Sequence, residues 1–484
     1  MNVDHGGPAL ASSLAPPYIW CHSMEPFFAT RRLSRRELLQ TASCGFGYLA
    51  LASLSTELSA AESSNPLAPK PPHFPPRAKR VIFLYMAGAP SHVDTFDYKP
   101  QLAKDDGKPA PGKGNRKLLK SPFVFQQHGK SGLWLPEIFP ELAKHADDLC
   151  LLNSLHTDLP NHPQASVQLH TGNFQQTRPS MGAWTLYGLG TENQELPGFI
   201  TINPPGGSGG AVNYGSAFLP AAYQGTRIGG EGGKRAAERL ANLENPRLSS
   251  ELQRKELDLL QDLNRHRLAK DEVNTELEGV IESYELAFRM EGAVPQVMDY
   301  SNESHSTLSA YGIGEKRSDA FGKQCLLARR FAEAGVRFIE LSLGGWDQHK
   351  DLKARLTANA HAIDKPIAAL LQDLKQRGLL KDTLLVWGGE FGRTPGAQNS
   401  NGRDHNAKGF SMWMAGGGVK GGFRYGATDE YGIEAAKDPM HIHDLHATIL
   451  YLLGLDHERL TYRYSGRDFK LTDTAGIVAK GVLA

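Results

Sequence analysis

Cysteine is scarce in this sequence. Four cysteines occur among 484 residues, and two of them, Cys21 and Cys44, fall in an N-terminal segment that we expect to be removed. Cys150 and Cys325 remain, which is too few for a disulfide framework or a zinc-ribbon pattern. One bridge could form between them in an oxidising compartment, but two buried apolar thiols are the favoured interpretation.

An excess of charge of one sign is also missing. The 53 basic and 52 acidic residues leave a formal net charge of +1, so nothing indicates a nucleic-acid or membrane-surface partner. The apolar run at residues 45–54 is shorter than the roughly 20 residues that a membrane-spanning helix needs. What is present is the composition of a globular protein, 40% hydrophobic and 22% charged, in a chain long enough to bury a large core.

The N-terminal region resembles a twin-arginine export signal. Arg35 and Arg36 precede the apolar run, and the small residues at 59–61 form a plausible cleavage point. We therefore expect residues 1–61 to be this signal with an N-terminal extension. The protein would be exported, periplasmic or extracellular, and would have no membrane span once the signal is removed. The alternative interpretation is an N-terminal membrane anchor.

The rest of the chain is typical of an α/β protein. Residues 62–78 are a proline-rich linker without a packed core, and residues 79–484 form the expected domain. Helical patterns at 351–380 and 443–455 alternate with apolar runs that end in glycine or polar residues. These runs, each typical of a buried parallel strand, lie at 81–86, 149–155, 198–204, 337–345 and 383–389. The alternation predicts a mainly parallel central sheet flanked by helices.

Residues 235–300 differ from this pattern. The segment is charged, poor in glycine and helical by propensity. It is either a helical insertion that caps the sheet or a surface helical hairpin without a role in chemistry.

Acidic, basic and imidazole side chains follow four of the expected strands. In open α/β sheets, ligands bind beyond the carboxyl ends of the strands, so we expect these side chains to share a site. The predicted metal ligands are His92 and Asp94 after the first strand, Asp347 and His349 after the fourth, and Glu390, Asp404 and His405 after the last. His162, after the second strand, and Arg393 are the predicted catalytic residues.

This combination of residue types suits divalent metal chemistry. Many hydrolases bind such ions in pairs and use them to clamp the oxygens of an anionic ester. Imidazole ligands favour zinc, manganese or iron, so we expect one or two ions, zinc or manganese rather than calcium. Arg393 would hold the anion in its planar fork, or would merely pair with Glu390. His162 begins an expected helix that Asn161 would cap. The free N–H groups at the start of this helix would also attract an anion.

Other polar residues have ordinary structural interpretations. His156 and His361 are expected to be structural, whereas His170 is open between a structural role and the site. Asp444 can cap a helix or take part in chemistry. The glycine-rich stretches 206–210 and 416–422 lack the spacing of nucleotide-binding loops and are interpreted as turns.

The order of these motifs resembles the alkaline phosphatase and sulfatase superfamily. Within it, the chain looks most like the secreted, sulfatase-like family of domain of unknown function 1501, over roughly residues 78–480. "NHPQASVQLHTGN" (161–173) resembles the nucleophile helix, and "GGWDQH" (344–349) resembles the Asp and His metal ligands. "DTLLVWGGEFGRTP" (382–395) is similar to a strand with a metal aspartate, replaced here by Glu390, and "RDHN" (403–406) occupies the place of a later metal histidine.

The resemblance implies an alkaline phosphatase-like fold, a metal site and hydrolysis of sulfate or phosphate esters, including those of a sulfated glycan. Two positions depart from the family pattern. Asn161 or His162 stands where the nucleophile is expected, and Gly88 stands near the place of a first metal aspartate, for which Asp94 could substitute.

Water activated by the metal could then attack directly, with Ser91 and Ser180 as outside candidates for a covalent step. The alternative is a non-catalytic, degenerate member that binds a glycan or a partner protein at the cell surface.

Overall fold

The computed structural model describes residues 65–111, 116–229, 248–268 and 275–484. The chain divides into two units, Met1–Glu62 and Ser63–Ala484, and every described residue belongs to the second. The predicted export signal, residues 1–61, therefore lies outside the described residues. Within the described ranges, no helix combines the length and the apolar character needed to cross a membrane.

A nine-stranded sheet forms the centre of this unit, in the order β12-β4-β11-β8-β1-β7-β5-β6, with β15 beside β4. Its strands are β1 (Arg80–Met86), β4 (Leu149–His156), β5 (Phe199–Ile202), β6 (Thr226–Ile228), β7 (Phe338–Leu343), β8 (Thr383–Gly388), β11 (Phe410–Gly416), β12 (Phe423–Tyr425) and β15 (Met440–His441). The five strands expected from apolar runs are all present, as β1, β4, β5, β7 and β8. All seven residues of β1 are buried, as a strand covered on both faces requires.

The sheet is parallel except for one strand. β11 pairs antiparallel with both β4 and β8, and the other pairs are parallel. The strands β1, β4, β7 and β8 therefore end at the same edge, as predicted. Because β11 runs the other way, its first residue, Phe410, lies at that edge opposite Leu155.

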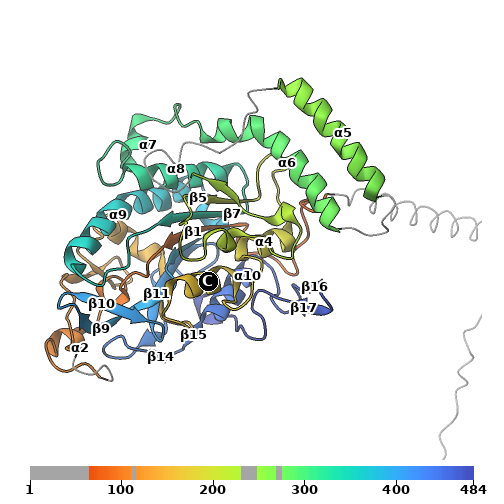
Figure 1. Cartoon of the computed structure of the whole chain (residues 1–484). Coiled ribbons are helices and arrows are strands. Elements are labelled where there is room, and N and C mark those ends of the chain that lie inside the picture. Colours follow the sequence, from red (N-terminus) through yellow and green to blue (C-terminus); the bar gives the residue numbers. More distant parts are fainter. Residues whose placement is uncertain (1–64, 112–115, 230–247, 269–274) are drawn as a thin grey trace, which may run out of the picture. The chain divides into compact units, whose positions relative to one another are not determined.

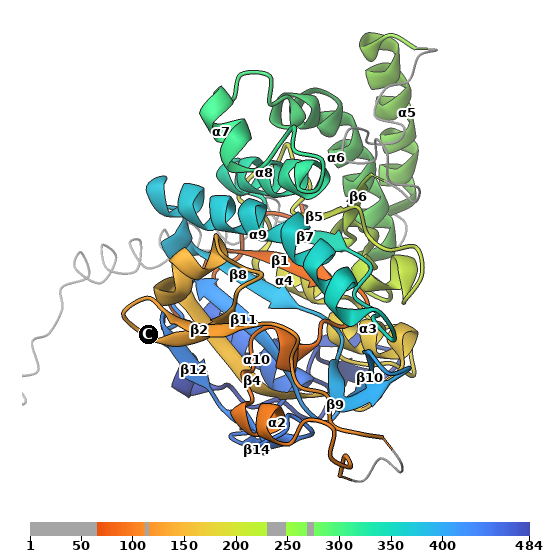
Figure 2. The ribbon, with the colours of Figure 1, turned by 90° about the vertical axis from the view of Figure 1, so that its left-hand side faces the viewer.

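Helices cover both faces of the sheet (Figures 1 and 2). α8 (Asp319–Glu333) and α9 (Leu352–Gln376) lie on one face, and α4 (Met181–Leu189) and α10 (Ile442–Leu452) lie on the other. α9 and α10 correspond to the helices predicted at 351–380 and 443–455. Leu356, Ile363, Ile367 and Leu374 recur at helical spacing on one side of α9, and their burial packs this helix against the rest of the core. The α/β fold class with a mainly parallel sheet is confirmed.

The remaining elements are short or peripheral. The helices are α2 (Pro100–Lys104), α3 (His162–Thr171), α5 (Ser250–Leu268), α6 (Thr275–Met298) and α7 (His305–Ala310), with short 3₁₀ segments η2 (His92–Asp94), η3 (Leu142–Asp148), η4 (Gly210–Tyr214), η5 (Ala221–Tyr223), η7 (Leu380–Asp382) and η8 (Lys480–Val482). The strand pairs are β2 (Phe125–His128) with β3 (Leu133–Pro136), β9 (Gly392–Gln398) with β10 (Gly402–Asn406), β13 (Ala427–Thr428) with β14 (Ala435–Lys437), and β16 (Tyr462–Tyr464) with β17 (Arg467–Phe469).

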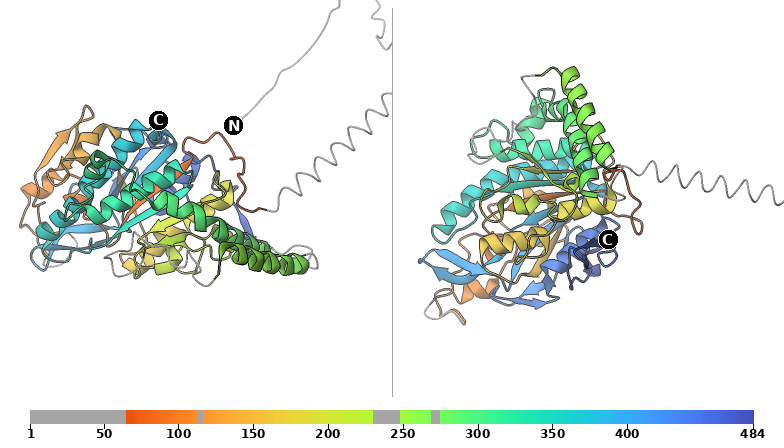
Figure 3. Two further views of the ribbon diagram at one scale, coloured as in Figure 1. Left: turned by 90° about the horizontal axis from the view of Figure 1, so that it is seen from above. Right: turned by 45° about the vertical axis from the view of Figure 1, so that its right-hand side comes forward.

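Two helices, α5 and α6, occupy the predicted insertion. Figure 3 shows them in green, side by side. Leu286, Met290 and Val294 of α6 are buried in the main core, so this helix is an integral part of the domain. α5 packs on α6 and, as described below, carries a second apolar face.

The described part of the predicted linker, residues 65–78, is packed against the domain rather than free. Leu67 is buried in the main core. The backbone N–H of Lys70 donates to the carbonyl of Leu189 at the end of α4, and that of Arg77 donates to Leu452 of α10. The prolines exclude regular structure here, but they leave enough N–H groups to fix the segment to two helices.

Cys150 and Cys325 are free and buried, on β4 and α8 respectively. The prediction of two buried thiols is confirmed.

Candidate metal centre

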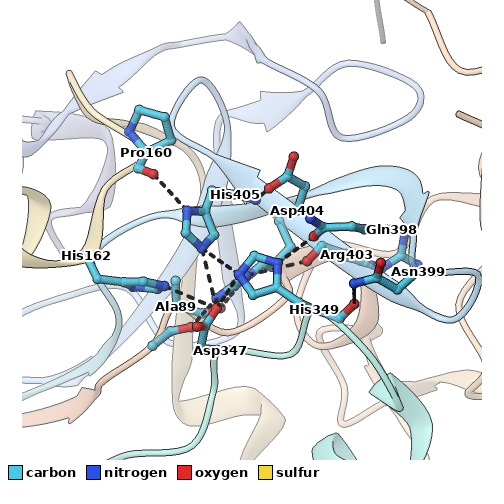
Figure 4. A network of polar contacts seen from close by, with 12 residues as sticks. Ala89, Pro160, His162, Asp347, His349, Gln398, Asn399, Arg403, Asp404 and His405 are labelled. Carbon is cyan, nitrogen blue, oxygen red and sulfur yellow. Dashed lines mark hydrogen bonds and ion pairs between the residues drawn. The ribbon is translucent and has the colours of Figure 1, made fainter. Parts of the chain in front are cut away.

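Four side chains meet at the edge where the parallel strands end. They are His162, the first residue of α3, Asp347 and His349, which follow β7, and His405 of β10. One ligand atom from each lies within 4.8 Å of the corresponding atoms of the others. Figure 4 shows the three imidazole rings pointing towards Asp347. We call these four residues the His–Asp cluster.

Asp347 lies at the middle of the cluster. Its Oδ1 is 3.2 Å from Nε2 of His162, 2.8 Å from Nε2 of His349 and 3.4 Å from Nε2 of His405. The Nε2 atoms of His349 and His405 are 3.0 Å apart. Because the Asp347 side chain is 44% exposed, solvent reaches the cluster from its side.

Each imidazole is oriented from behind through its other nitrogen. The Nδ1 contacts are His162 to Glu390 Oε1 at 2.6 Å, His349 to Gln398 Oε1 at 2.5 Å, and His405 to the carbonyl of Pro160 at 2.8 Å. Each contact fixes a ring so that Nε2 faces the cluster, which is how proteins orient histidine ligands of metals.

Glu390 lies behind His162, not in the cluster. Its carboxylate is fully buried and accepts hydrogen bonds from Nδ1 of His162, from the backbone N–H of Gly88 at 3.0 Å and from the hydroxyl of Tyr85 at 3.2 Å. The sequence predicted a direct metal ligand here. The structure instead gives the carboxylate three donors and no contact with the other cluster residues.

Two glycines allow neighbouring chain segments to pack directly against the backbone of the Asp347–His349 loop. Gly88 has a φ of +107°, and a Cβ there would lie 2.6 Å from the backbone nitrogen of Asp347. A Cβ at Gly402 would lie 2.1 Å from the carbonyl group of His349. A side chain at either position would therefore push the Asp347–His349 loop away from its neighbours. This contact explains why no aspartate stands at position 88.

Opposite charges in the site shift one another's pKa values. Burial lowers the pKa of His162, but the carboxylates of Asp347 and Glu390 outweigh burial and raise it to about 9. Burial raises the pKa of Asp347, but hydrogen bonds from two histidines and from Arg393 hold it well below its ordinary range. Burial lowers the pKa of the Arg393 guanidinium, while the carboxylates of Asp347, Glu390 and Asp404 oppose that shift.

Arg393 supports Asp347 from inside the protein. It is buried, and its guanidinium donates to Asp347 Oδ1 at 2.7 Å, to the carbonyl of Gly88 at 2.5 Å and to the carbonyl of Ala89 at 3.0 Å. These bonds occupy the guanidinium that the sequence analysis assigned to an anion, and its ion-pair partner is Asp347 rather than Glu390.

Besides Glu390, three more of the predicted ligands do not join the cluster, and two of these are His92 and Asp404. His92 is buried, and its Nε2 donates to the carbonyl of Gly432 at 2.9 Å. Asp404 is half-buried and pairs with Arg116 at 2.6 Å. Both residues lie in loops that reach the correct edge of the sheet, but their side chains are committed to other partners.

Asp94 is the last of the predicted ligands that lie outside the cluster. It forms an ion pair with Arg403, with contacts of 2.5 and 3.0 Å, and both side chains are fully buried. Arg403 also donates to the carbonyls of Thr394, Pro395 and Leu119. The pair therefore joins the loop after β1 to the β9–β10 hairpin that carries His405. Arg403 could not be predicted from the sequence, because no local pattern marks a buried arginine.

The hydroxyl groups considered for a covalent step have structural roles. Ser91 donates to Asp94 at 2.5 Å, and Ser180 caps α4 by accepting from the N–H of Ala183 at 3.4 Å. Among the described residues, no serine, threonine or cysteine side chain hydrogen-bonds to a residue of the His–Asp cluster. Asp444 caps α10 through the N–H of His441.

A cavity of about 430 Å³ opens beside the cluster. Residues that line it include Pro111, Asp158, Pro160, Pro395, His405 and Lys408. His405 belongs to both the cavity and the cluster, so the cavity borders the cluster at this residue.

Comparison with known proteins supplies a family. The family described as "Protein of unknown function (DUF1501)" matches residues 78–483. No curated protein sequence matches the chain.

Among solved structures, the PsFucS1 sulfatase from Pseudoalteromonas sp. is 12% identical, with 84% of this chain and 72% of that chain covered and a TM-score of 0.35. The lipoteichoic acid synthase LtaP from Listeria monocytogenes is 11% identical, with 84% and 78% covered and a TM-score of 0.32. A mutant TAB5 alkaline phosphatase is 10% identical, with 79% and 99% covered and a TM-score of 0.33. Similarity at this level says nothing of the activity of this chain.

Proposed function

The chain is a member of the DUF1501 family, and we propose that its His–Asp cluster holds a divalent cation for the hydrolysis of a sulfate or phosphate ester. The observation that supports this most directly is the convergence of three Nε2 atoms on Asp347 while each Nδ1 is engaged elsewhere.

The protonation of the two facing imidazoles supports a cation. A backbone carbonyl can only accept, so Nδ1 of His405 must carry a proton where it meets Pro160. In the neutral ring, Nε2 of His405 is then a lone pair, and the contact with Gln398 gives His349 the same tautomer. Two lone pairs facing each other at 3.0 Å repel, and this repulsion is relieved by a cation that both nitrogens bind or by a proton on one ring.

The ligand set limits which cations fit. Three imidazoles and one carboxylate suit zinc, manganese or iron better than magnesium or calcium, which prefer oxygen ligands. The described residues form one such group, which supports a single ion rather than a pair. When bound, the cation supplies Lewis-acid chemistry that polarises an ester and makes water a usable nucleophile at neutral pH.

The charge of the loaded site would favour an anionic substrate. Asp347 and Glu390 contribute two negative charges, and Arg393 contributes a positive one. A divalent cation then leaves the site with a net positive charge, which is attractive to a sulfate or phosphate group. The exposed side of Asp347 and the cavity beside His405 provide the route of approach.

The residues around the cluster have separable roles in this proposal. His349 and His405 would bind the cation, and Arg393 would hold Asp347 in place for the same purpose. His162, which starts a helix and has a raised pKa, would give up its Nε2 proton to the solvent when the cation binds. Its Nδ1 proton would stay on the hydrogen bond to Glu390.

The experiment that tests the metal site is elemental analysis of the purified full chain. We expect stoichiometric zinc or manganese in the wild type and its loss in Asp347→Ala and His405→Ala. Two matched controls are available: Asp404→Ala removes an acid whose carboxylate lies outside the cluster and contacts Arg116 and the backbone N–H of His405, and His361→Ala removes an exposed histidine of α9. Both controls should keep the metal. If Asp347→Ala and His405→Ala also keep it, the cluster is not the site.

Hydrolysis is tested separately, on aryl sulfates and aryl phosphates with the metal-loaded protein. Turnover that disappears in Asp347→Ala and persists in Asp404→Ala supports the enzyme. No serine, threonine or cysteine side chain within the described ranges hydrogen-bonds to the cluster, which favours one other function, a non-catalytic protein that binds an anionic ligand. Stoichiometric metal without turnover of either substrate class would support that function.

Export by the twin-arginine route is part of the proposal. Arg35 and Arg36 precede the apolar run, whereas Arg31 and Arg32 form a second pair slightly earlier in the chain. Changing both Arg35 and Arg36 to lysine should retain the protein in the cytoplasm of a host with this pathway. The same change at Arg31 and Arg32 should not, and unchanged export of the first variant would exclude the route.

A further inference from the structure

Helix α5 has two apolar faces, and only one of them is covered. On the inner face, Leu257 is 7% exposed and Gln261 is fully buried, with its amide donating to the carbonyl of Ile281 on α6. Arg254 and Glu285 form a paired hydrogen bond across the same helix–helix contact. The inner face therefore accounts for the packing of α5 on α6.

The outer face carries leucines in the open. Leu252 is 53% exposed, Leu259 63%, Leu260 43% and Leu263 60%. At about 100° per residue, Leu252, Leu259 and Leu263 lie within about 40° of each other around the helix. Single exposed leucines are ordinary, but a row of them on one face of a helix marks a surface that binds something.

Two charged residues lie within the same row. Glu256 follows Leu252 by one turn, and Arg267 follows Leu263 by one turn. Neither forms an ion pair with any residue that the structure describes. Their neighbours behave differently, because Lys255 pairs with Glu251 and Arg265 pairs with Asp262 along the helix. We call Leu252, Glu256, Leu259, Leu260, Leu263 and Arg267 the leucine stripe.

We propose that the leucine stripe pairs with the leucine stripe of a second copy of this chain, with the two α5 helices antiparallel. Around a twofold axis between positions 261 and 262, Glu256 of each copy faces Arg267 of the other, and Leu260 faces Leu263. The positions match because 256 and 267, like 260 and 263, are placed symmetrically about that point. A parallel pair would instead put Glu256 against Glu256, which repels.

The charge pattern also separates this partner from a lipid surface. A membrane-binding helix has a polar face rich in lysine and arginine. The exposed residues of α5 include the acids Glu251, Glu256, Asp258 and Asp262 beside the bases Lys255, Arg265 and Arg267, so the helix lacks the excess of positive charge that anionic lipids attract. A partner with its own leucines and both signs of charge fits better, and the chain itself supplies one.

The leucine stripe is connected to the main core through α6. α5 is fixed to α6, and α6 is fixed to the main core through Leu286, Met290 and Val294. Figure 1 shows α5 remote from the β9–β10 hairpin, so pairing would leave the His–Asp cluster open. The proposal therefore stands or falls independently of metal binding and hydrolysis.

The first test is sedimentation of the purified full chain over a range of concentrations. We expect a reversible dimer in the wild type and a weaker one in the double variant Leu259→Ser, Leu263→Ser. Ile477→Ser is the matched control, since Ile477 is 77% exposed and lies outside α5. It should leave the dimer unchanged. A monomeric wild type, or a dimer that is equally strong in the leucine variant, would overturn the proposal.

The second test is a charge exchange that distinguishes this geometry from general stickiness. Glu256→Arg alone and Arg267→Glu alone should each weaken the dimer by about tenfold or more, because each creates two like-charge contacts about the twofold axis. The double variant reverses both charges and should restore most of the lost affinity. Affinity in the double variant that is no better than in the single variants would rule out the antiparallel pairing.

Discussion

Glu390 and His162 are joined by a hydrogen bond of 2.6 Å from Nδ1 to a carboxylate that is fully buried. Glu390 therefore acts through the histidine, by fixing the ring and making its outward nitrogen a better ligand. Removing the charge with Glu390→Gln should weaken metal affinity by about 10- to 100-fold without removing the metal altogether.

Titration of zinc into chelator-treated protein measures this change, with thermal unfolding to show that the variant is folded. Complete loss of metal would make Glu390 a direct ligand, and unchanged affinity would make it irrelevant to the site. Gln398→Ala offers a comparison, because it removes the weaker, neutral acceptor behind His349.

We expect that breaking the ion pair of Asp94 and Arg403 will strongly lower the stability of the folded protein. Asp94→Asn leaves the arginine buried without its charge partner, which we expect to lower the free energy of unfolding by about 3–5 kcal/mol. Asp404→Asn breaks a pair whose side chains are 32% and 27% exposed, and should cost about 0–1 kcal/mol. Urea denaturation of both variants decides the matter. Equal costs would show that burial of the first pair has no energetic importance.

His446 predicts how stability depends on pH. Burial, together with nearby His443, lowers the pKa of His446 to about 3, below its ordinary value of 6.5. As the pH falls from 6.5 to 3, the unfolded chain binds a proton here that the folded protein does not. The free energy of unfolding should therefore fall over this range, by as much as about 5 kcal/mol from this residue.

The variant His446→Gln isolates this contribution, because glutamine can still donate to the carbonyl of Leu169 but cannot titrate. Urea denaturation between pH 4 and pH 7 should give a flatter dependence in the variant than in the wild type, because glutamine takes up no proton in either state. Parallel curves for the two proteins would show that His446 is not the residue responsible.

The buried thiols predict resistance to alkylation. Burial raises the pKa of the Cys150 thiol to about 12 and raises that of Cys325 as well. Iodoacetamide should leave both residues unlabelled in the native protein at mildly alkaline pH and label both in urea, because the thiolate is the reactive form. Mass spectrometry of the two peptides reads each thiol separately. Native labelling of Cys150 would show that β4 opens more readily than its packing implies.

The gathering of polar side chains at one edge of the sheet could be predicted from the apolar runs and from the parallel direction of the strands. Continuous apolar runs mark the buried strands, and parallel strands must end at a common edge. The side chains just beyond β4, β7 and the β8 region therefore had to be neighbours. His162, Asp347, His349 and His405 come from these loops, and the structure brings them together.

The partners of individual side chains could not be predicted in this way. Asp94, like Asp347, follows a strand that ends at this edge, but it faces Arg403, which is 309 positions away in the chain. Whether an acid meets an arginine or a histidine depends on tertiary packing and leaves no periodic pattern in the sequence. The β9–β10 hairpin was missed for a related reason, since Pro395 and Gly396 are typical of a loop.

The reversed direction of β11 has a consequence for how the site can change. His162, Asp347 and His349 depend on chain that is leaving the sheet, whereas His405 stands on chain that is about to enter it. An insertion or deletion at the tip between β9 and β10 can be absorbed before β11 begins, without shifting the register of any core strand. A change in this one hairpin could thus alter the His–Asp cluster while the rest of the architecture is preserved.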